Sequence, residues 1–149
     1  MIRVEVIDGE IFTDERGSIS SVNGFDAEDI RRFYLIQHPD TSVIRGWNAH
    51  KFERKWFYCI KGAFTLALVK IDRWDNPSTN LEPEIFYLSA GKSRIIAVPA
   101  GYASCMRADM PDSILMVLSD KTVAESTQDS WKFDKNLWIN WEKLERKHD

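Results

Sequence analysis

Residues 55–71 read KWFYCIKGAFTLALVKI, and this stretch decides the fold class of the chain. It contains two runs rich in aromatic, β-branched and aliphatic residues, Lys55–Lys61 and Ala63–Ile71, which meet at Lys61-Gly62. Such runs favour β-strands, and a glycine that adopts positive φ favours a tight turn between them. We therefore expect an antiparallel hairpin here.

Short segments of similar composition recur on both sides of this hairpin. A longer polar connection, Asp72–Pro83, follows it, and a turn at residues 98–101 ends a later strand. Short strands separated by turns and loops favour a β-sandwich or a small barrel. We expect a helix only in the tail, at residues Trp141–Lys147. The other predicted strands are Ile2–Ile7, Ser18–Val22, Ile30–Gln37, Glu84–Ser89, Ile95–Val98 and Ile114–Ser119.

Length and charge exclude several classes of protein. A chain of 149 residues fits one domain, which we expect to span residues 1–149. Its net charge of −3 argues against broad electrostatic binding to nucleic acid. No apolar run approaches the roughly 20 residues that cross a bilayer, and residues 1–10 lack the apolar core of a secretory signal. These features predict a soluble, cytoplasmic protein with no nucleic-acid or membrane partner.

The two cysteines, Cys59 and Cys105, are far apart in the sequence and have no CxxC spacing. This arrangement favours neither a disulfide framework nor a zinc cluster. We expect both side chains to be buried, unreactive thiols.

Polar residues concentrate just before the central hairpin, in the stretch RGWNAHKFERK at residues 45–55. Alternation along an extended strand places Asn48 and His50 on the same face, and Glu53 and Lys55 follow after an expected turn. Enclosing these side chains and Arg45 inside a barrel is unfavourable unless the cavity is wet or a ligand binds them. The alternative is a solvated strand edge that carries the charges.

The spacing of this stretch resembles the first cupin motif, in which two histidines and a downstream glutamate bind a metal inside a jelly roll. In this chain the three positions are Asn48, His50 and Glu53, and the histidine of the second cupin motif falls on Ser104. One histidine and one carboxylate hold a metal weakly, because first-row metals need three or four good protein ligands. We therefore expect an all-β cupin jelly-roll barrel or sandwich with a short C-terminal helical tail, and no metal or other cofactor.

Five motifs in the correct order resemble the metal-free cupins that act on nucleotide sugars. These are the dTDP-4-dehydrorhamnose 3,5-epimerase family and the related dTDP-4-keto-6-deoxyglucose 3,4-ketoisomerases. The stretch NAHK at residues 48–51 is nearer the ketoisomerases, whereas Lys55 and the C-terminal segment are nearer the epimerases. The motifs are DERGSI at 14–19, IRGWN at 44–48, KWFYCIKG at 55–62, the run from LSAG to PAGYA at 88–103, and LWINW at 137–141.

The resemblance implies removal of a proton beside a ketone, which requires a base, a donor to the developing oxyanion and an acid. The family's histidine base falls on Asn48, and the epimerases' tyrosine acid falls close to Met116. The lysine that faces the enolate matches Lys55. His50 is the candidate substitute base, and Asp134 is the candidate carboxylate that orients the base. The candidates for the acid are Glu53, Tyr58 and Tyr102.

The binding residues of the family are better preserved. Arg16 and Arg45 match its phosphate contacts, and guanidinium groups suit a diphosphate through paired, charge-assisted hydrogen bonds. The resemblance also implies a homodimer in which the N-terminal strand carries Arg16 into the partner's pocket. The remaining candidates for binding a nucleotide sugar are Arg32, Tyr34, Trp47, Asn48, Glu53 and Tyr102. For the aromatic residues, the alternative is packing in the core.

Two functions of different class follow from these residues. The first is an epimerase or ketoisomerase that uses His50 and Lys55. The second is a catalytically silent cupin that binds a sugar nucleotide or acts as a structural or regulatory partner. The loss of both matched proton carriers favours the second function, whereas the retention of Lys55, His50 and both arginines favours the first.

Overall fold

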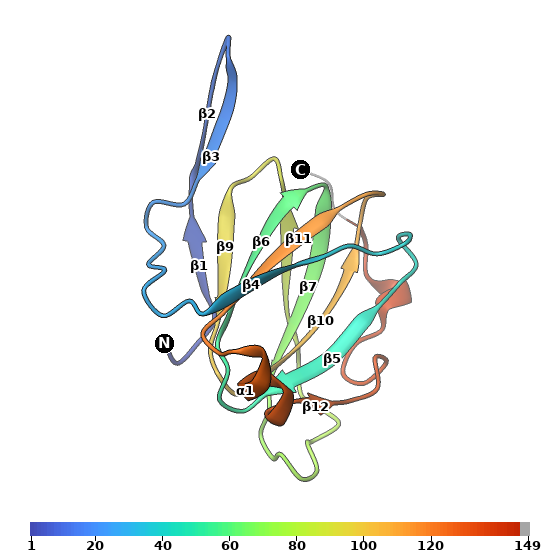
Figure 1. Cartoon of the computed structure of the whole chain (residues 1–149). Coiled ribbons are helices and arrows are strands. Elements are labelled where there is room, and N and C mark those ends of the chain that lie inside the picture. Colours follow the sequence, from blue (N-terminus) through green and yellow to red (C-terminus); the bar gives the residue numbers. More distant parts are fainter. Residues whose placement is uncertain (147–149) are drawn as a thin grey trace.

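Two antiparallel sheets of five strands each face one another and enclose the interior of the molecule (Figure 1). The computed structural model describes residues 1–146. The first sheet has the order β1-β9-β6-β11-β4 and the second has the order β12-β5-β10-β7-β8. The strands of the first sheet are β1 (Glu5–Asp8), β4 (Arg32–Ile36), β6 (Lys55–Lys61), β9 (Arg94–Val98) and β11 (Ile114–Ser119). Those of the second are β5 (Arg45–His50), β7 (Ala63–Lys70), β8 (Glu84–Ser89), β10 (Tyr102–Ala108) and β12 (Trp131–Lys132).

The interior between the sheets is an apolar core built by alternate residues of the strands. Strand β7 contributes Phe64, Leu66 and Leu68, and the facing strand β11 contributes Leu115 and Val117; all five side chains are buried. Burial of each such side chain stabilises the fold by about 1.5–3 kcal/mol. This core confirms the expected all-β fold.

The outer face of the second sheet is covered by the C-terminal segment. Trp47 and Ala49 of β5 pack there against Trp141, which lies in the short 3₁₀ helix η1 (Trp141–Lys143). The buried Arg107 guanidinium of β10 donates hydrogen bonds of 2.8 Å to the carbonyl oxygens of both Trp141 and Leu144. The tail is therefore part of the folded unit and covers the face of strand β5 that carries Trp47 and Ala49.

A second hairpin, formed by β2 (Glu10–Asp14) and β3 (Gly17–Ser21), projects away from the two sheets (Figure 1). Its strands pair only with each other, and the cross-strand partners Phe12 and Ile19 are 59% and 67% exposed. An isolated two-stranded hairpin is marginally stable in water. Within residues 1–146, the exposed apolar side chains of this hairpin are therefore not packed against another sheet or segment, unlike those of the two large sheets.

The predicted elements agree with the structure where the apolar pattern is strong. The strands predicted at Lys55–Lys61, Glu84–Ser89 and Ile114–Ser119 have the observed bounds, and Gly62 makes the predicted turn with φ of 73°. The expected helix at Trp141–Lys147 is wrong beyond Lys143, because Leu144 is extended and Arg107 binds its carbonyl; residue 147 lies outside the described part. Sequence reasoning missed β2, β10, β12 and the helix α1 (Val123–Gln128).

Both cysteines are free and buried, as expected. Burial raises the pKa of the Cys59 and Cys105 thiols to about 12, so neither is a thiolate at neutral pH. Within residues 1–146, no helix has the length and apolar character needed to cross a membrane.

Candidate functional site

Strand β5 carries the polar residues of the candidate site on one of its faces. Asn48 and His50 lie on the face that lines the interior, while Trp47 and Ala49 belong to the apolar cluster on the outer face. Close approach to β10 requires glycine at position 46, because its φ is 129° and a Cβ atom would lie 2.5 Å from the Ser104 carbonyl oxygen. The expectation that Asn48 and His50 share an inward face is therefore confirmed.

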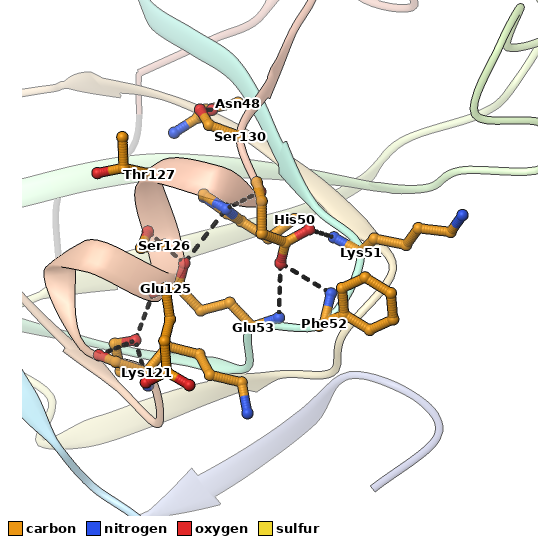
Figure 2. A network of polar contacts seen from close by, with 12 residues as sticks. Asn48, His50, Lys51, Phe52, Glu53, Lys121, Glu125, Ser126, Thr127 and Ser130 are labelled. Atoms are coloured by element: carbon orange, nitrogen blue, oxygen red, sulfur yellow. Dashed lines mark hydrogen bonds and ion pairs between the residues drawn. The ribbon is translucent and has the colours of Figure 1, made fainter.

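His50 is held by acceptors on one side of its ring. Its Nδ1 lies 2.7 Å from the Asp129 carbonyl oxygen and 3.2 Å from Glu53 Oε1, so Nδ1 carries the proton (Figure 2). Its Nε2 is buried and has no hydrogen-bond partner within the described residues. Burial, together with the charge of Lys55, lowers the pKa of His50, although Glu53 and the Asp129 carbonyl oppose this shift. The ring is neutral at pH 7 with its lone pair on Nε2, which is the form a general base requires.

Glu53 is the acceptor at the centre of a buried polar network. Its Oε1 accepts a hydrogen bond of 2.6 Å from Ser126 Oγ, and its Oε2 accepts from Ser119 Oγ and, at 3.1 Å, from Arg32. Burial alone raises the pKa of this carboxyl, but the two serine hydroxyls, Lys55 and His50 outweigh it, and the net pKa is lowered. Glu53 is therefore ionised at neutral pH and does not supply the acid of the reaction.

Asp129 fixes the turn that follows β5. Its carboxylate accepts the backbone N–H groups of Lys51, Phe52 and Glu53 at 2.8–3.1 Å, while its carbonyl oxygen accepts from His50 (Figure 2). The expected orienting carboxylate, Asp134, does not occupy this position: it is exposed and accepts the backbone N–H of Asn136. Asp134 follows strand β12, so its side chain turns into its own loop.

Three adjoining hollows lie along this polar face. The main cleft, of about 570 Å³, runs from Arg45 and Tyr34 inward to Phe57 and Met106. The helix-side hollow, of about 430 Å³, lies between His50 and α1. The inner chamber, of about 10 Å³, has the volume of roughly one water molecule and lies among His50, Glu53, Tyr102 and Ser104. Asn48 and Lys55 line all three hollows.

The other polar candidates lie at the mouth of the main cleft. Arg45 is exposed there, and its Nε donates to His38 Nε2 at 3.4 Å. The Tyr34 ring lies 5.0 Å from the Arg32 guanidinium carbon and 5.8 Å from Lys55 Nζ. Arg32 donates hydrogen bonds to Glu53 and to the Lys121 carbonyl. Its side chain therefore supports the polar network around Glu53, and fewer of its donors are left for a ligand in the main cleft.

Two aromatic residues that are candidates for binding a nucleotide sugar, Trp47 and Tyr102, pack against other residues of the protein. Trp47 also lines the main cleft, but it is 1% exposed and its Nε1 donates to the Leu137 carbonyl at 2.7 Å on the outer face, so its indole ring is engaged in packing. Alternation decides this result, because Trp47 precedes Asn48 on the strand. Tyr102 is buried in the core and reaches only the inner chamber; burial and, to a smaller extent, Glu84 raise its pKa.

The two remaining acid positions lie outside the interior. Tyr58 packs on the outer face of the first sheet, where its hydroxyl lies 3.0 Å from Ser93 Oγ. Met116 pairs with Tyr58 across β6 and β11, whereas its neighbours Leu115 and Val117 fill the core. The interior face of β11 therefore presents aliphatic side chains where the family resemblance placed a tyrosine.

Arg16 lies far from the cleft of its own chain, at the turn of the projecting hairpin (Figure 1). Its side chain is 79% exposed and forms a 2.6 Å ion pair with Asp14. Arg16 is thus not brought together with Arg45 within one chain.

Several residues of the network were missed by sequence reasoning. The capping box of Thr122 and Glu125 is a local signal for the start of α1 and was available in the sequence. The remaining residues have no local signal, because they reach Glu53, His50 or Asn48 across 66 to 82 positions of the chain. They are Ser119, Ser126, Asp129 and Ser130.

A family model described as FdtA, WxcM-like, C-terminal, matches residues 2–137 of this chain. The chain belongs to this family. No curated protein sequence matches this FdtA-family chain.

Solved structures of sugar-nucleotide enzymes share the fold of this FdtA-family chain. A histidine-to-asparagine variant of the 3,4-ketoisomerase QdtA from Thermoanaerobacterium thermosaccharolyticum, in complex with TDP-4-keto-6-deoxyglucose, is 21% identical, with a TM-score of 0.68 over 88% of each chain. The rmlC epimerase of Mycobacterium tuberculosis is 22% identical, with a TM-score of 0.75 over 94% of this chain and 74% of that one. The dTDP-4-dehydrorhamnose 3,5-epimerase of Bacillus anthracis is 20% identical, with a TM-score of 0.76 over 96% and 87%.

Proposed function

We propose that this protein is a cytoplasmic, metal-independent isomerase of nucleotide-linked 4-keto-6-deoxy sugars, in which His50 is the base. The observation that carries the proposal is the His50 ring, whose Nδ1 is held by Asp129 and Glu53 while its buried Nε2 has no hydrogen-bond partner among residues 1–146. The FdtA-family match and the fold shared with dTDP-sugar epimerases and ketoisomerases support the substrate class.

The proposed reaction begins with proton transfer from carbon to nitrogen. His50 Nε2 takes a proton from a carbon beside the C4 ketone, the C–H electron pair forms a C=C bond, and the carbonyl π pair moves to oxygen as an enolate. Lys55, which lines the same hollows as His50, stabilises that oxygen. Protonation of the same carbon from the opposite face, by solvent or an acid, inverts that centre. For a 3-keto sugar, the C4 oxygen takes a proton, the C3 hydroxyl loses its proton as C3=O forms, and the C=C electron pair takes a proton at C4.

NMR of dTDP-4-keto-6-deoxyglucose incubated with the protein in D₂O tests this function. Deuterium at C5, or at C3 without a 3-keto product, identifies an epimerase, and a 3-keto product identifies a ketoisomerase. A Lys55→Met variant should lower the rate about 10²–10³-fold, because it removes a donor to the enolate. The matched control is Lys70→Met, at the exposed end of β7. A substrate that binds but is neither labelled nor converted contradicts the enzyme and favours a silent sugar-nucleotide-binding cupin.

The pKa of His50 predicts the pH dependence of the reaction. Because that pKa lies below its ordinary value of 6.5, kcat/KM should fall to half of its plateau only at a pH below 6.5, where Nε2 becomes protonated. The free energy of unfolding should also decrease as the pH falls below 6.5, since the unfolded histidine binds a proton that the folded one does not. Titration of the imidazole ¹⁵N resonances checks both the pKa and the tautomer; an Nε2–H tautomer contradicts the assignment.

We also propose that two copies form a homodimer in which the β2-β3 hairpin of one chain completes the cleft of the other. The exposed Phe12 and Ile19 supply an apolar contact, and Arg16 supplies a guanidinium that the cleft of a single chain lacks beside Arg45. With Arg45, Arg16 of a second copy would bind the diphosphate.

Sedimentation and dTDP titration test this dimer. Phe12→Ser together with Ile19→Ser should yield a monomer, whereas Phe52→Ser, which also alters an exposed aromatic residue, should not. Arg16→Ala should leave the dimer intact and weaken dTDP binding about 10–100-fold, the worth of hydrogen bonds to a charged group. The neighbouring Glu15→Ala is the control. A monomeric natural protein contradicts the proposal.

A further inference from the structure

Asn48 occupies the position at which the three hollows of the site adjoin one another. It shares this position with Lys55, since both residues line the main cleft, the inner chamber and the helix-side hollow. His50 lines two of the three. A sugar carbon placed within reach of His50 Nε2 would therefore lie in a hollow that Asn48 and Lys55 also line.

The Asn48 amide is oriented by its neighbour after α1. Ser130 Oγ donates a hydrogen bond of 3.2 Å to Asn48 Oδ1, and Figure 2 shows the two side chains next to each other. Because the oxygen of the amide is engaged, its Nδ2 carries the two hydrogens that remain for a ligand. Nδ2 makes no hydrogen bond within residues 1–146, and it belongs to a residue that lines every hollow.

We propose that Asn48 is a catalytic residue that donates a hydrogen bond from Nδ2 to the C4 oxygen of the sugar, together with the Lys55 ammonium. This inference rests on the proposed function. As His50 removes the proton and the carbonyl π pair moves onto oxygen, the negative charge develops between an amide donor and an ammonium. Fixed donors aimed at such an oxygen stabilise the transition state more than the ground state. Asn48 thus has an active role, although it cannot act as a base.

The ¹³C chemical shift of C4 in bound dTDP-4-keto-6-deoxyglucose tests the donor pair, whether or not the sugar is converted. Binding to the natural protein should move the C4 ketone resonance downfield, because hydrogen bonds polarise the carbonyl. Asn48→Asp keeps the shape but removes Nδ2–H, so most of this displacement should be lost and kcat should fall about 10²–10³-fold. Ser130→Ala frees the amide to rotate and should give a smaller loss of both. The matched control is Asn80→Asp, which makes the same change on the exposed loop between β7 and β8.

The two proposals fail in different ways. If the sugar binds but exchanges no deuterium, the isomerase function is wrong while the C4 shift still decides the role of Asn48. If Asn48→Asp keeps both the C4 shift and kcat of an active enzyme, the donor role of Asn48 is wrong and the isomerase stands. A natural protein that binds no keto sugar overturns both.

Discussion

His50→Gln is expected to lower the rate of deuterium exchange into the keto sugar about 10²–10⁴-fold, the contribution of a positioned general base. Glutamine has a similar size and can donate to the Asp129 carbonyl as His50 Nδ1 does, but it has no basic nitrogen in place of Nε2. Single-turnover mass spectrometry of the sugar in D₂O measures the loss.

The structural control for this variant is binding of dTDP, which we propose to contact Arg45 at the mouth of the cleft and not His50. Unchanged dTDP affinity and an unchanged unfolding transition show that the site is intact. If exchange continues at the natural rate, another group is the base. Tyr102, which lines the inner chamber with His50, would then be the first residue to change.

Asp109→Ala is expected to lower the free energy of unfolding by about 3–5 kcal/mol, because it leaves a buried guanidinium without its carboxylate. Asp109 accepts hydrogen bonds from Arg107 Nε at 3.0 Å and from Thr65 Oγ1 at 2.5 Å, and its side chain is fully buried. Arg146 approaches the same carboxylate at 3.5 Å. Arg107 in turn binds the carbonyls of the tail, so the variant weakens the tail's attachment as well.

Urea denaturation measures this change, with Asp75→Ala on the exposed loop between β7 and β8 as the matched control. Limited proteolysis of the tail should become faster in Asp109→Ala than in Asp75→Ala. A difference in unfolding free energy below about 1 kcal/mol, the range of exposed ion pairs, would contradict the role assigned to Asp109.

Sequence reasoning reached the fold because its strongest signals are local. Gly62 and the two runs around it specify a hairpin without reference to the rest of the chain, and alternation correctly placed Asn48 and His50 on one face. The same rule, applied to the residue before Asn48, would have placed Trp47 in the outer cluster where it lies. A family match by motif cannot make this distinction, because it compares positions and not faces.

The surroundings of the base were not predictable in the same way. Asp129 lies 79 positions from His50 and contacts it through a backbone carbonyl, a group that every residue has. Asp134 was the more attractive candidate in the sequence, because the resemblance calls for a carboxylate. The fold instead uses the Asp129 side chain to hold the turn after β5 and gives the histidine a carbonyl and Glu53.

The two faces of β5 allow residues of the site and residues of the core to be changed independently. Trp47 and Ala49 pack against the tail, whereas Asn48 and His50 line the hollows. Adjacent positions of the strand therefore have separate roles, one in stability and one in the site. A change at Asn48 or His50 is expected to alter the site while the packing beneath the tail is kept, and a change at Trp47 or Ala49 is expected to do the reverse. Strand β5 can therefore carry an amide at position 48, where the resemblance places a histidine, without a change in the packing that holds the tail.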